Sequence, residues 1–287
     1  QARYALFQHI FAGHAYGQRR LGTTETLKNI TRGDIYNFAK DHLARDNLII
    51  AVAGDITPQQ LGDDLDKIFG ALPAHAEQTS IVDVTWPAKP ATILTPREGT
   101  QTEILFAMPG PKREDQDYYA AEIANYILGG GSFQSRLMQD VRDKKGLTYG
   151  IDTGLSPAAH ASLTIGNPPT HNPKTAEAST IASTTMKKFY DAGATDTEIK
   201  AAQDYLTGSL ALALTSTDKI AAALVDIQRD HLGIDYLDRR NNLIRNVTPA
   251  DMQSVIKRWF NPQGLFVSMV GKPDGVAPTE TRSLVRE

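Results

Sequence analysis

The chain has 287 residues, of which 41% are hydrophobic and 22% are charged, and its formal net charge is −3. This composition is that of a globular protein with a sizeable core, and it excludes the collagen-like, coiled-coil and disordered classes. The weakly acidic balance gives no basic field for nucleic acid, and no apolar run approaches the ~18 residues that a membrane-spanning helix needs.

The sequence contains no cysteine and seven histidines. The lack of cysteine excludes disulfides, Cys-ligated zinc sites, iron–sulfur clusters and thiol nucleophiles. No pair of histidines has the His-x-x-Glu-His or His-Glu-x-x-His spacing that places two imidazoles around zinc on one helix face. We therefore predict that this chain alone forms no metal site.

The first strong pattern in chain order, from Thr26 to Asp55, recurs without a gap from Leu243 to Lys272. Each copy has a Thr typical of a helix N-cap, an Asp three residues later, an amphipathic helix, a turn, and an apolar strand that ends in Gly. Thr31 corresponds to Thr248, so the copies are offset by 217 residues (248 − 31 = 217). The repeat predicts two similar α+β domains in tandem, the first of them truncated, because the match to the start of the second copy lies outside this chain.

The offset between the copies sets the expected domain organisation. Residues 1–72 are expected to be the C-terminal remnant of the first domain, and residues 73–90, with three prolines and no helical period, a linker. Residues 91–275 are expected to form a complete second domain, and residues 276–287 a loose tail with few apolar side chains. The chain begins without Met, so we interpret its start as an internal boundary.

The second copy carries its strands and helices in groups. An apolar period of 2 predicts strands, and a period of 3.6 predicts helices. The grouping, rather than a strict alternation of strand and helix, favours an α+β fold, a mostly antiparallel sheet with helices packed on one face. The expected elements are strands at Ala91–Thr95 and Thr102–Met108, helices at Asp115–Leu128 and Phe133–Arg142, strands at Leu147–Leu155 and Ala161–Gly166, helices at 172–192, from Thr195, at Thr217–Leu232 and at Tyr236–Arg245, and then the repeat helix and a final strand.

Two local signals mark helix starts. Asn172 followed by Pro173 is typical of an N-cap and a first helical position. Thr195 and Glu198 have the spacing of a capping box. We expect a helix to begin at each of these points.

Three consecutive glycines, Gly129–Gly131, follow the first helix of the second copy. They follow a helix rather than a strand and have no Lys-Ser/Thr partner, so we reject a phosphate-binding loop. We interpret them as residues that permit close packing or a bend. In the next helix, Phe133, Leu137 and Val141 are expected to face inward.

The most informative stretch runs from Leu128 to Gly150 and carries a helix that ends in the cations Arg142, Lys144 and Lys145. Cations at a helix C-terminus stabilise it by ~0.3–1 kcal/mol, so a structural role alone would account for them. A strand that carries Tyr149 follows, and Arg142 and Tyr149 could converge on one extended ligand. A guanidinium and a phenol are suitable donors to a peptide carbonyl or to a developing oxyanion.

This stretch resembles the second-domain signature of the pitrilysin/insulinase family of zinc peptidases, which includes the mitochondrial processing peptidases. The likeness runs from Phe7 to Gly271 and also accounts for the repeat, because the family is built from similar α+β domains in tandem. In the first copy it rests on Gly13–Gly17, Gly22-Thr23 and the strand that ends at Gly54-Asp55. The family pattern Arg-x-Lys-x-Gly-Leu-x-Tyr is matched by Arg142, Lys144, Gly146, Leu147 and Tyr149.

The resemblance implies a chamber formed by two such pairs of domains. Zinc is held there by an inverted His-x-x-Glu-His motif and a later Glu of the first domain. Arg142 and Tyr149 would lie across the chamber from the zinc, bind the substrate backbone and, through the phenol, support the tetrahedral intermediate. The peptide would bind extended, as an added strand. The glycines Gly129, Gly130 and Gly131 are possible chamber-lining residues.

The sequence departs from the family where the zinc motif is concerned. That motif is absent, and the helix matching Asp115–Leu128 in the first copy would lie in the part that is not present. Without zinc there is no activated water, so we expect no peptidase activity from this chain on its own. Zinc is expected in a partner chain or in the missing upstream part.

Three roles are compatible with these features. The first, which we favour, is a non-catalytic subunit of a heterodimeric zinc metallopeptidase, with a homologous zinc-bearing chain as partner and an extended peptide or unfolded polypeptide as substrate. The second is the C-terminal part of a single-chain zinc metallopeptidase whose His-x-x-Glu-His motif lies upstream. The third is a purely structural subunit like those of respiratory complexes, and the intact Arg142 and Tyr149 argue against it. The compartment is not readable, and a bacterial periplasm is favoured by analogy alone.

Overall fold

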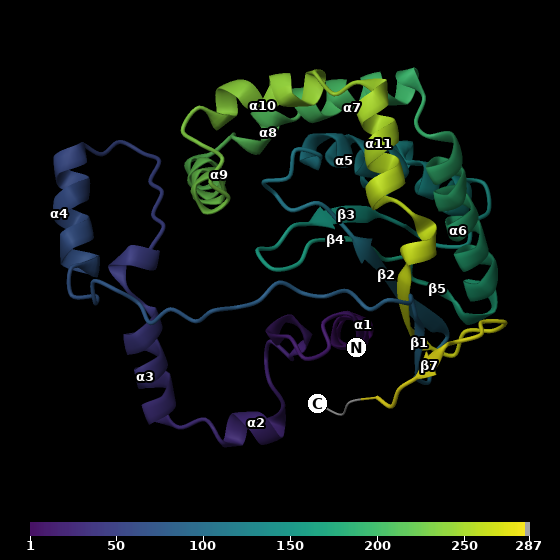
Figure 1. Ribbon diagram of the computed structural model, residues 1–287, viewed down its shortest axis with the longest axis horizontal. Coiled ribbons are helices and arrows are strands. Elements are labelled where there is room, and N and C mark those ends of the chain that lie inside the picture. Colours follow the sequence, from purple (N-terminus) through teal and green to yellow (C-terminus); the bar gives the residue numbers. More distant parts are fainter. Residues whose placement is uncertain (285–287) are drawn as a thin grey trace. The chain divides into compact units, whose positions relative to one another are not determined.

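Figure 1 shows the computed structural model of the chain, which describes residues 1–284. The chain divides into two compact units. Unit 1 comprises residues 1–20, 83–208 and those from 239 onward, and unit 2 comprises residues 21–82 and 209–238. None of the helices described within residues 1–284 is long and apolar enough to cross a membrane.

Unit 1 is built on a seven-stranded sheet with the order β3-β4-β2-β6-β1-β7, and β5 pairs with β2 beside this path. All pairs are antiparallel except those that β1 makes with β6 and β7. The sheet confirms the expected α+β fold with mostly antiparallel pairing. The strands are β1 (Thr92–Pro96), β2 (Gln101–Pro109), β3 (Thr153–Ser156), β4 (Leu163–Gly166), β5 (Thr170–His171), β6 (Phe266–Gly271) and β7 (Glu280–Thr281).

The helices of unit 1 cover the two faces of this sheet unequally (Figure 1). The larger core contains Phe106 and Met108 of β2 together with the main helices, and the smaller one joins Ala107 of β2 to Leu6 and Ile10 of α1. Successive residues of a strand point to opposite faces, so one strand serves both cores. α1 (Ala2–Ile10) covers one face, and the other is covered by α5 (Tyr118–Asn125), α6 (Thr175–Ala192), α7 (Asp196–Gly208), the end of α10 (Tyr236–Arg245) and α11 (Pro249–Trp259).

Unit 2 is helical in its described residues and has little core of its own. Of these residues only Ala44 and Tyr236 are buried. Within the unit, Asp46 accepts a hydrogen bond from the Ala76 N–H at 3.0 Å, so the start of the expected linker folds back onto this segment. Its helices are α2 (Thr24–Lys28), α3 (Arg32–His42), α4 (Pro58–Phe69), α8 (Leu210–Ala213) and α9 (Thr217–Arg229).

The repeat is reproduced in the helix bounds. α3 and α11 begin and end at residues separated by the same 217 positions. In each copy the Thr hydroxyl accepts from the Asp N–H three residues on, at 3.2 Å in Thr31 and at 3.2 Å in Thr248. A single 3₁₀ turn follows each helix, at Arg45–Asn47 and at Pro262–Gly264. The local part of the repeat therefore folds as the sequence predicts.

The expected first-copy strand, from Leu48 to Gly54, is wrong for the residues described. Its counterpart is β6, which lies between β2 and β1. Unit 2 has no strand among its described residues, and an apolar segment without a ladder partner does not become a strand. The counterpart glycines differ accordingly. A Cβ on Gly271 would meet the Thr102 Cα at 2.8 Å, whereas one on Gly54 would have no neighbour within 4 Å.

Two further expectations in the second copy are corrected. Of the strand expected at Leu147–Leu155, only the end forms a strand, as part of β3. The segment before it is held by the Thr148 hydroxyl and one bridge to Thr170 rather than by a full ladder. Asn172 is not the N-cap of α6. Its amide donates to the Gly99 carbonyl at 2.8 Å and accepts from the Thr102 hydroxyl at 2.7 Å, and α6 starts after Lys174.

The helix expected at Phe133–Arg142 forms in two pieces. Ser132–Gln134 is a 3₁₀ turn, and a π-helical turn spans Met138–Asp143. Leu137 and Val141 are buried as expected, but Phe133 is 57% exposed because the 3₁₀ turn directs it outward. The preceding helix likewise ends in a π-helical turn, at Tyr126–Gly130. The capping box of Thr195 and Glu198 forms as predicted.

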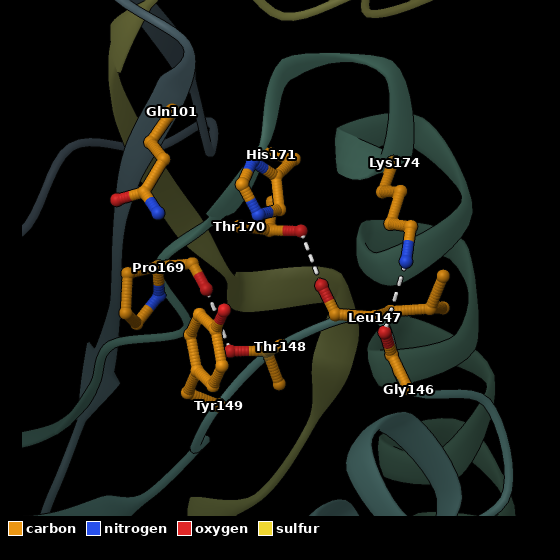
Figure 2. Close-up of a pocket in the computed structure, with 9 residues that line it drawn as sticks. All are labelled: Gln101, Gly146, Leu147, Thr148, Tyr149, Pro169, Thr170, His171 and Lys174. Carbon is orange, nitrogen blue, oxygen red and sulfur yellow. Dashed lines mark hydrogen bonds between the residues drawn. The ribbon is translucent and has the colours of Figure 1, made fainter.

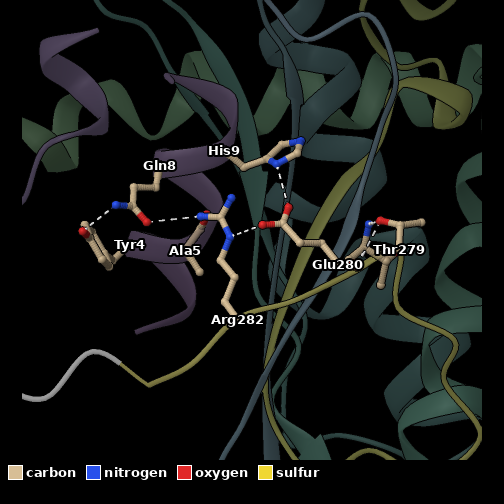
Figure 3. Close-up of polar contacts among 8 residues, drawn as sticks. Tyr4, Ala5, Gln8, His9, Thr279, Glu280 and Arg282 are labelled. Carbon is tan, nitrogen blue, oxygen red and sulfur yellow. Dashed lines mark hydrogen bonds and ion pairs between the residues drawn. The ribbon is translucent and has the colours of Figure 1, made fainter. Parts of the chain in front are cut away.

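The expected loose tail is instead docked over residues 279–282 (Figure 3). β7 pairs with β1, and the Glu280 carboxylate is 3.0 Å from His9 Nδ1 of α1. Arg282 donates to Glu280 and, at 3.1 Å, to the Ala5 carbonyl. The Arg282 hydrogen bond is the main reason that the pKa of Glu280 lies below its ordinary value. Residues 285–287 lie outside the described part.

Candidate functional site

Arg142 lies on a fixed base. It belongs to the π-helical turn at Met138–Asp143, and Val141 in this turn and Leu137 just before it are fully buried. Asp140 in the same turn binds Lys144 at 2.7 Å and the Thr185 hydroxyl of α6 at 2.7 Å. Burial opposes the ionisation of Asp140, but these two hydrogen bonds outweigh it and lower its pKa. The turn that carries Arg142 is therefore tied to α6.

The structure brings the Arg142 side chain to the backbone of Tyr149, while the convergence of the two side chains on one ligand stays a prediction. The Arg142 Nε donates to the Tyr149 carbonyl at 3.1 Å, and one terminal nitrogen binds Asp143 at 2.6 Å. The guanidinium also lies 4.9 Å from the centre of the Phe133 ring, within the range of a cation–π contact. The Arg142 side chain is still 38% exposed. It is therefore oriented by three neighbours and open to a ligand.

The Tyr149 side chain projects from this anchored backbone. It is 81% exposed, and its hydroxyl has no hydrogen-bond partner among residues 1–284. The backbone beneath it is fixed by the Thr148 hydroxyl, which lies 2.7 Å from the Gly150 carbonyl and 2.6 Å from that of Pro169. Figure 2 shows the Tyr149 ring beside Pro169. The phenol is thus an exposed donor on an anchored backbone, with no acceptor for it among the described residues.

A pocket of about 180 Å³ opens next to Tyr149 (Figure 2). β5 forms its wall by pairing with β2 on one side and bridging to Thr148 on the other. Thr170 in this wall donates to the Leu147 carbonyl at 2.5 Å. The residues that line the pocket are Gln101, Gly146, Leu147, Thr148, Tyr149, Pro169, Thr170, His171 and Lys174.

The three glycines named as possible chamber-lining residues have packing roles that the structure makes explicit. A Cβ on Gly129 would lie 2.4 Å from the Thr153 hydroxyl oxygen, and one on Gly130 2.6 Å from the Asn125 amide. One on Gly131 would lie 2.7 Å from the Tyr126 carbonyl. Gly129 and Gly131 are buried and Gly130 is exposed. Their place in a chamber stays a prediction.

Sequence reasoning missed the residues that build the pocket around Tyr149. The residue types involved, threonine and histidine, occur in many strands. Thr170 and His171 pair with β2, about seventy positions earlier, and Thr148 bridges to Thr170. Lys174 did carry a signal. A cation just before a helix lies at the positive end of the helix dipole, where it is unfavourable, so its presence there calls for a reason.

The comparisons with known proteins place these residues in a family. The model of the peptidase M16 inactive domain matches residues 29–206, which is more than half of the chain. The chain belongs to the M16 peptidase family. The resemblance to the pitrilysin/insulinase peptidases is confirmed, and the matched stretch is that of a non-catalytic M16 domain.

Individual relatives agree with this placement. An uncharacterized zinc protease of Streptomyces coelicolor is 28% identical over 262 residues, which are 88% of this chain and 56% of the relative. A protein of Helicobacter pylori named as a non-peptidase homolog is 26% identical over 211 residues, which are 72% of this chain and 48% of the relative. The chain thus spans about half the length of the curated relatives it matches.

Solved structures give the same fold. The M16 inactive domain of Pseudomonas fluorescens superposes with a TM-score of 0.87 at 26% identity, over 96% of this chain and 66% of that one. A protease of Helicobacter pylori superposes with a TM-score of 0.79 at 16% identity, over 94% and 66%, which is a likeness of fold alone.

The zinc that some relatives' names imply does not fit the side chains of the described part of this chain. Within residues 1–284, no group of three or more His, Asp or Glu side chains could hold a metal. One neighbouring pair is His14 and His160, whose ring centres are 6.4 Å apart, and His160 binds Asp83 at 3.2 Å. These side chains pack and pair without converging on a common point.

Proposed function

We propose that this M16 domain is the non-catalytic subunit of a heterodimeric zinc metallopeptidase, in which Arg142 and Tyr149 hold the substrate for a partner's zinc site. The observation that carries the proposal is the exposed Tyr149 side chain, whose backbone carbonyl is held by Arg142 and whose hydroxyl has no partner among residues 1–284. An unsatisfied donor on a rigid backbone is what an external acceptor requires.

The two side chains suit a peptide backbone. The guanidinium offers several donors in a fixed plane, of which one is used on the Tyr149 carbonyl and one on Asp143. The remaining donors can reach a peptide carbonyl. The phenol can donate to the carbonyl oxygen that gains negative charge when the peptide is attacked. The peptide is held extended, and the zinc chemistry is supplied from outside this chain.

The test is proteolysis by the assembled enzyme. We expect Tyr149→Phe to lower kcat by about 10²-fold, the effect of removing one oxyanion donor. We expect Arg142→Ala to raise KM and lower kcat, because both the substrate contact and the hold on the Tyr149 carbonyl are lost. The measurement is turnover of a fluorogenic reporter peptide.

Matched controls separate this role from stability. Arg258 is also an exposed arginine, with a carboxylate partner at 2.9 Å and an aromatic ring at 4.7 Å, and Tyr205 is also an exposed tyrosine. Arg258→Ala and Tyr205→Phe should leave turnover within twofold of wild type. Wild-type turnover in the double variant of Arg142 and Tyr149 would refute the proposal.

A second candidate is the C-terminal part of a single-chain zinc peptidase. The observation that favours it is that the chain spans only about half of relatives named as zinc proteases. The two candidates differ in the source of zinc. If the protein purified from its native source retains zinc and cleaves the reporter without a second chain, the single-chain role holds and the heterodimer is excluded.

A further inference from the structure

The pocket beside Tyr149 is lined by donors and by no acid. Its lining contains the ammonium of Lys174, the imidazole of His171, the amide of Gln101 and the phenol of Tyr149, and no Asp or Glu within residues 1–284 lines it. Carboxylates are common partners of such groups in proteins, so a pocket with these donors and no described carboxylate in its lining has the chemistry to bind one from outside.

The backbone pairing explains why these donors share one wall. Gln101 of β2 and His171 of β5 are direct partners in the antiparallel pair, so their side chains lie on the same face. The next pair along, Thr102 and Thr170, points to the other face and is buried. Figure 2 shows Gln101 and His171 above the pocket and Tyr149 below it.

Lys174 supplies the charge on the opposite side. Its ammonium donates to the Gly146 carbonyl at 3.1 Å, and the described residues offer it no acidic partner. An ammonium has three donors, so two remain. Glu177, in the first turn of α6, is directed to Lys145 at 4.0 Å and does not line the pocket.

The position of Lys174 in its helix strengthens this reading. It is the N-cap of the 18-residue α6, and its side chain makes no capping bond. A cation and the positive end of a helix dipole repel each other, and an anion between them relieves that repulsion. The site thus combines a shaped pocket, an unpaired cation and a helix terminus of the same sign.

We infer that this pocket is a subsite for a carboxylate of the bound peptide, next to the backbone held by Arg142 and Tyr149. The inference rests on the proposed function for the identity of the ligand, a peptide. The carboxylate belongs either to an acidic side chain or to the C-terminus of the peptide. The chemistry is the same in both, and the test below separates them.

The first experiment measures binding to this chain without any peptidase assay. The probes are N-acetylglutamate α-amide, N-acetylglutamine α-amide and N-acetylglutamine, which carry a side-chain carboxylate, none and an α-carboxylate. The readout is the shift of the His171 ring signals in a ¹H–¹³C NMR titration, assigned with His171→Gln. We expect a saturable shift with a carboxylate probe and none with the neutral one. The carboxylate probe that binds more tightly identifies the source.

Variants link that shift to the pocket. Lys174→Met should weaken the carboxylate probe by about threefold to fivefold, the size of one partly exposed ion pair. Lys187→Met is the matched control, because Lys187 lies on the same helix and is paired with Asp191. An equal shift with the neutral probe, or unchanged binding in Lys174→Met, would overturn the inference.

The second experiment keeps this inference apart from the proposed function. In the assembled enzyme, kcat/KM is compared for reporter peptides that differ by Glu or Gln, or by a free or amidated C-terminus. Lys174→Met should abolish the preference for the carboxylate, whereas Arg142→Ala should slow both peptides and retain the preference. If Arg142→Ala slows both and the preference survives in Lys174→Met, only the subsite is wrong. If Arg142→Ala has no effect while the NMR result stands, only the proposed function is wrong.

Discussion

Helices α3 and α11 are two copies of one motif, and their surroundings in the structure differ. The apolar residues Met252 and Val255 of α11 are each 1% exposed, whereas their counterparts Ile35 and Phe38 of α3 are 63% and 64% exposed. Both helices have the same length and the same capping box. The comparison shows that local signals define a helix, whereas burial of its apolar face depends on elements that lie far away in the sequence.

The largest effect on stability is expected from placing a charge on the apolar face of α11, compared with the same change on α3. Val255→Asp buries a carboxylate without a partner in the larger core, so we expect it to cost more than about 4 kcal/mol of unfolding free energy. Phe38→Asp changes an exposed position, and we expect a change below about 0.5 kcal/mol. Urea unfolding followed by circular dichroism measures both. An equal loss in the two variants would mean that the α3 face is covered in solution.

A smaller effect concerns the acidic partner of a capping box. In unit 1, hydrogen bonds from Arg136 and Thr195 to Glu198 outweigh the cost of burial and lower its pKa to about 2. A lowered pKa stabilises the fold above the ordinary value of 4.5, and this contribution is lost as pH falls from there through about 2. Glu198→Gln should lower the free energy of unfolding by about 2 kcal/mol at neutral pH. It should also flatten the acid limb, which is the fall of this free energy below the ordinary pKa.

The control for that prediction is the exposed capping box of α3. Hydrogen bonds from Thr31 also lower the pKa of Asp34, but the carboxylate is fully exposed. Asp34→Asn should change the acid limb of the unfolding curve much less than Glu198→Gln does, because water screens the interactions of an exposed carboxylate. The measurement is unfolding free energy against pH for both variants. A limb unchanged in Glu198→Gln would contradict the assignment.

The smallest effect is expected from the cap hydroxyls. Thr248→Ala should cost about 1 kcal/mol, the usual value of an N-cap, because α11 is part of the core. Thr31→Ala should leave global unfolding unchanged and speed amide exchange in α3 alone, since a helix without a buried face opens locally. Hydrogen exchange read by mass spectrometry distinguishes the two. Faster exchange in α11 than in α3 would reverse the comparison.

The sequence predicted what depends on neighbours along the chain. The capping residues Thr31, Thr195 and Thr248 all cap as expected. The proximity of Arg142 to the Tyr149 backbone follows from the short turn between the end of a helix and the next extended segment, while the convergence of their side chains on one ligand stays a prediction. The fold class and the family followed from the grouping of the elements and from this motif.

The rest depends on contacts between distant residues. The Thr148 hydroxyl replaces a strand ladder in the site because Pro169 lies next to it, and no local pattern reveals that. Glu280 lies in a stretch with few apolar residues, yet it docks because β1 offers an open edge and His9 a partner. A strand pattern such as that of 48–54 predicts a strand only where an edge is available to pair with it.

The place of β6 in the sheet has a consequence for how the molecule is made. β6 lies between β2 and β1, and its residue Val267 pairs with Thr92, 175 positions earlier (267 − 92 = 175). While the chain is being synthesised, the edges of β1 and β2 that pair with β6 therefore stay open until Phe266–Gly271 has been made. Such distant pairing slows folding and leaves these edges able to pair with other chains in the meantime.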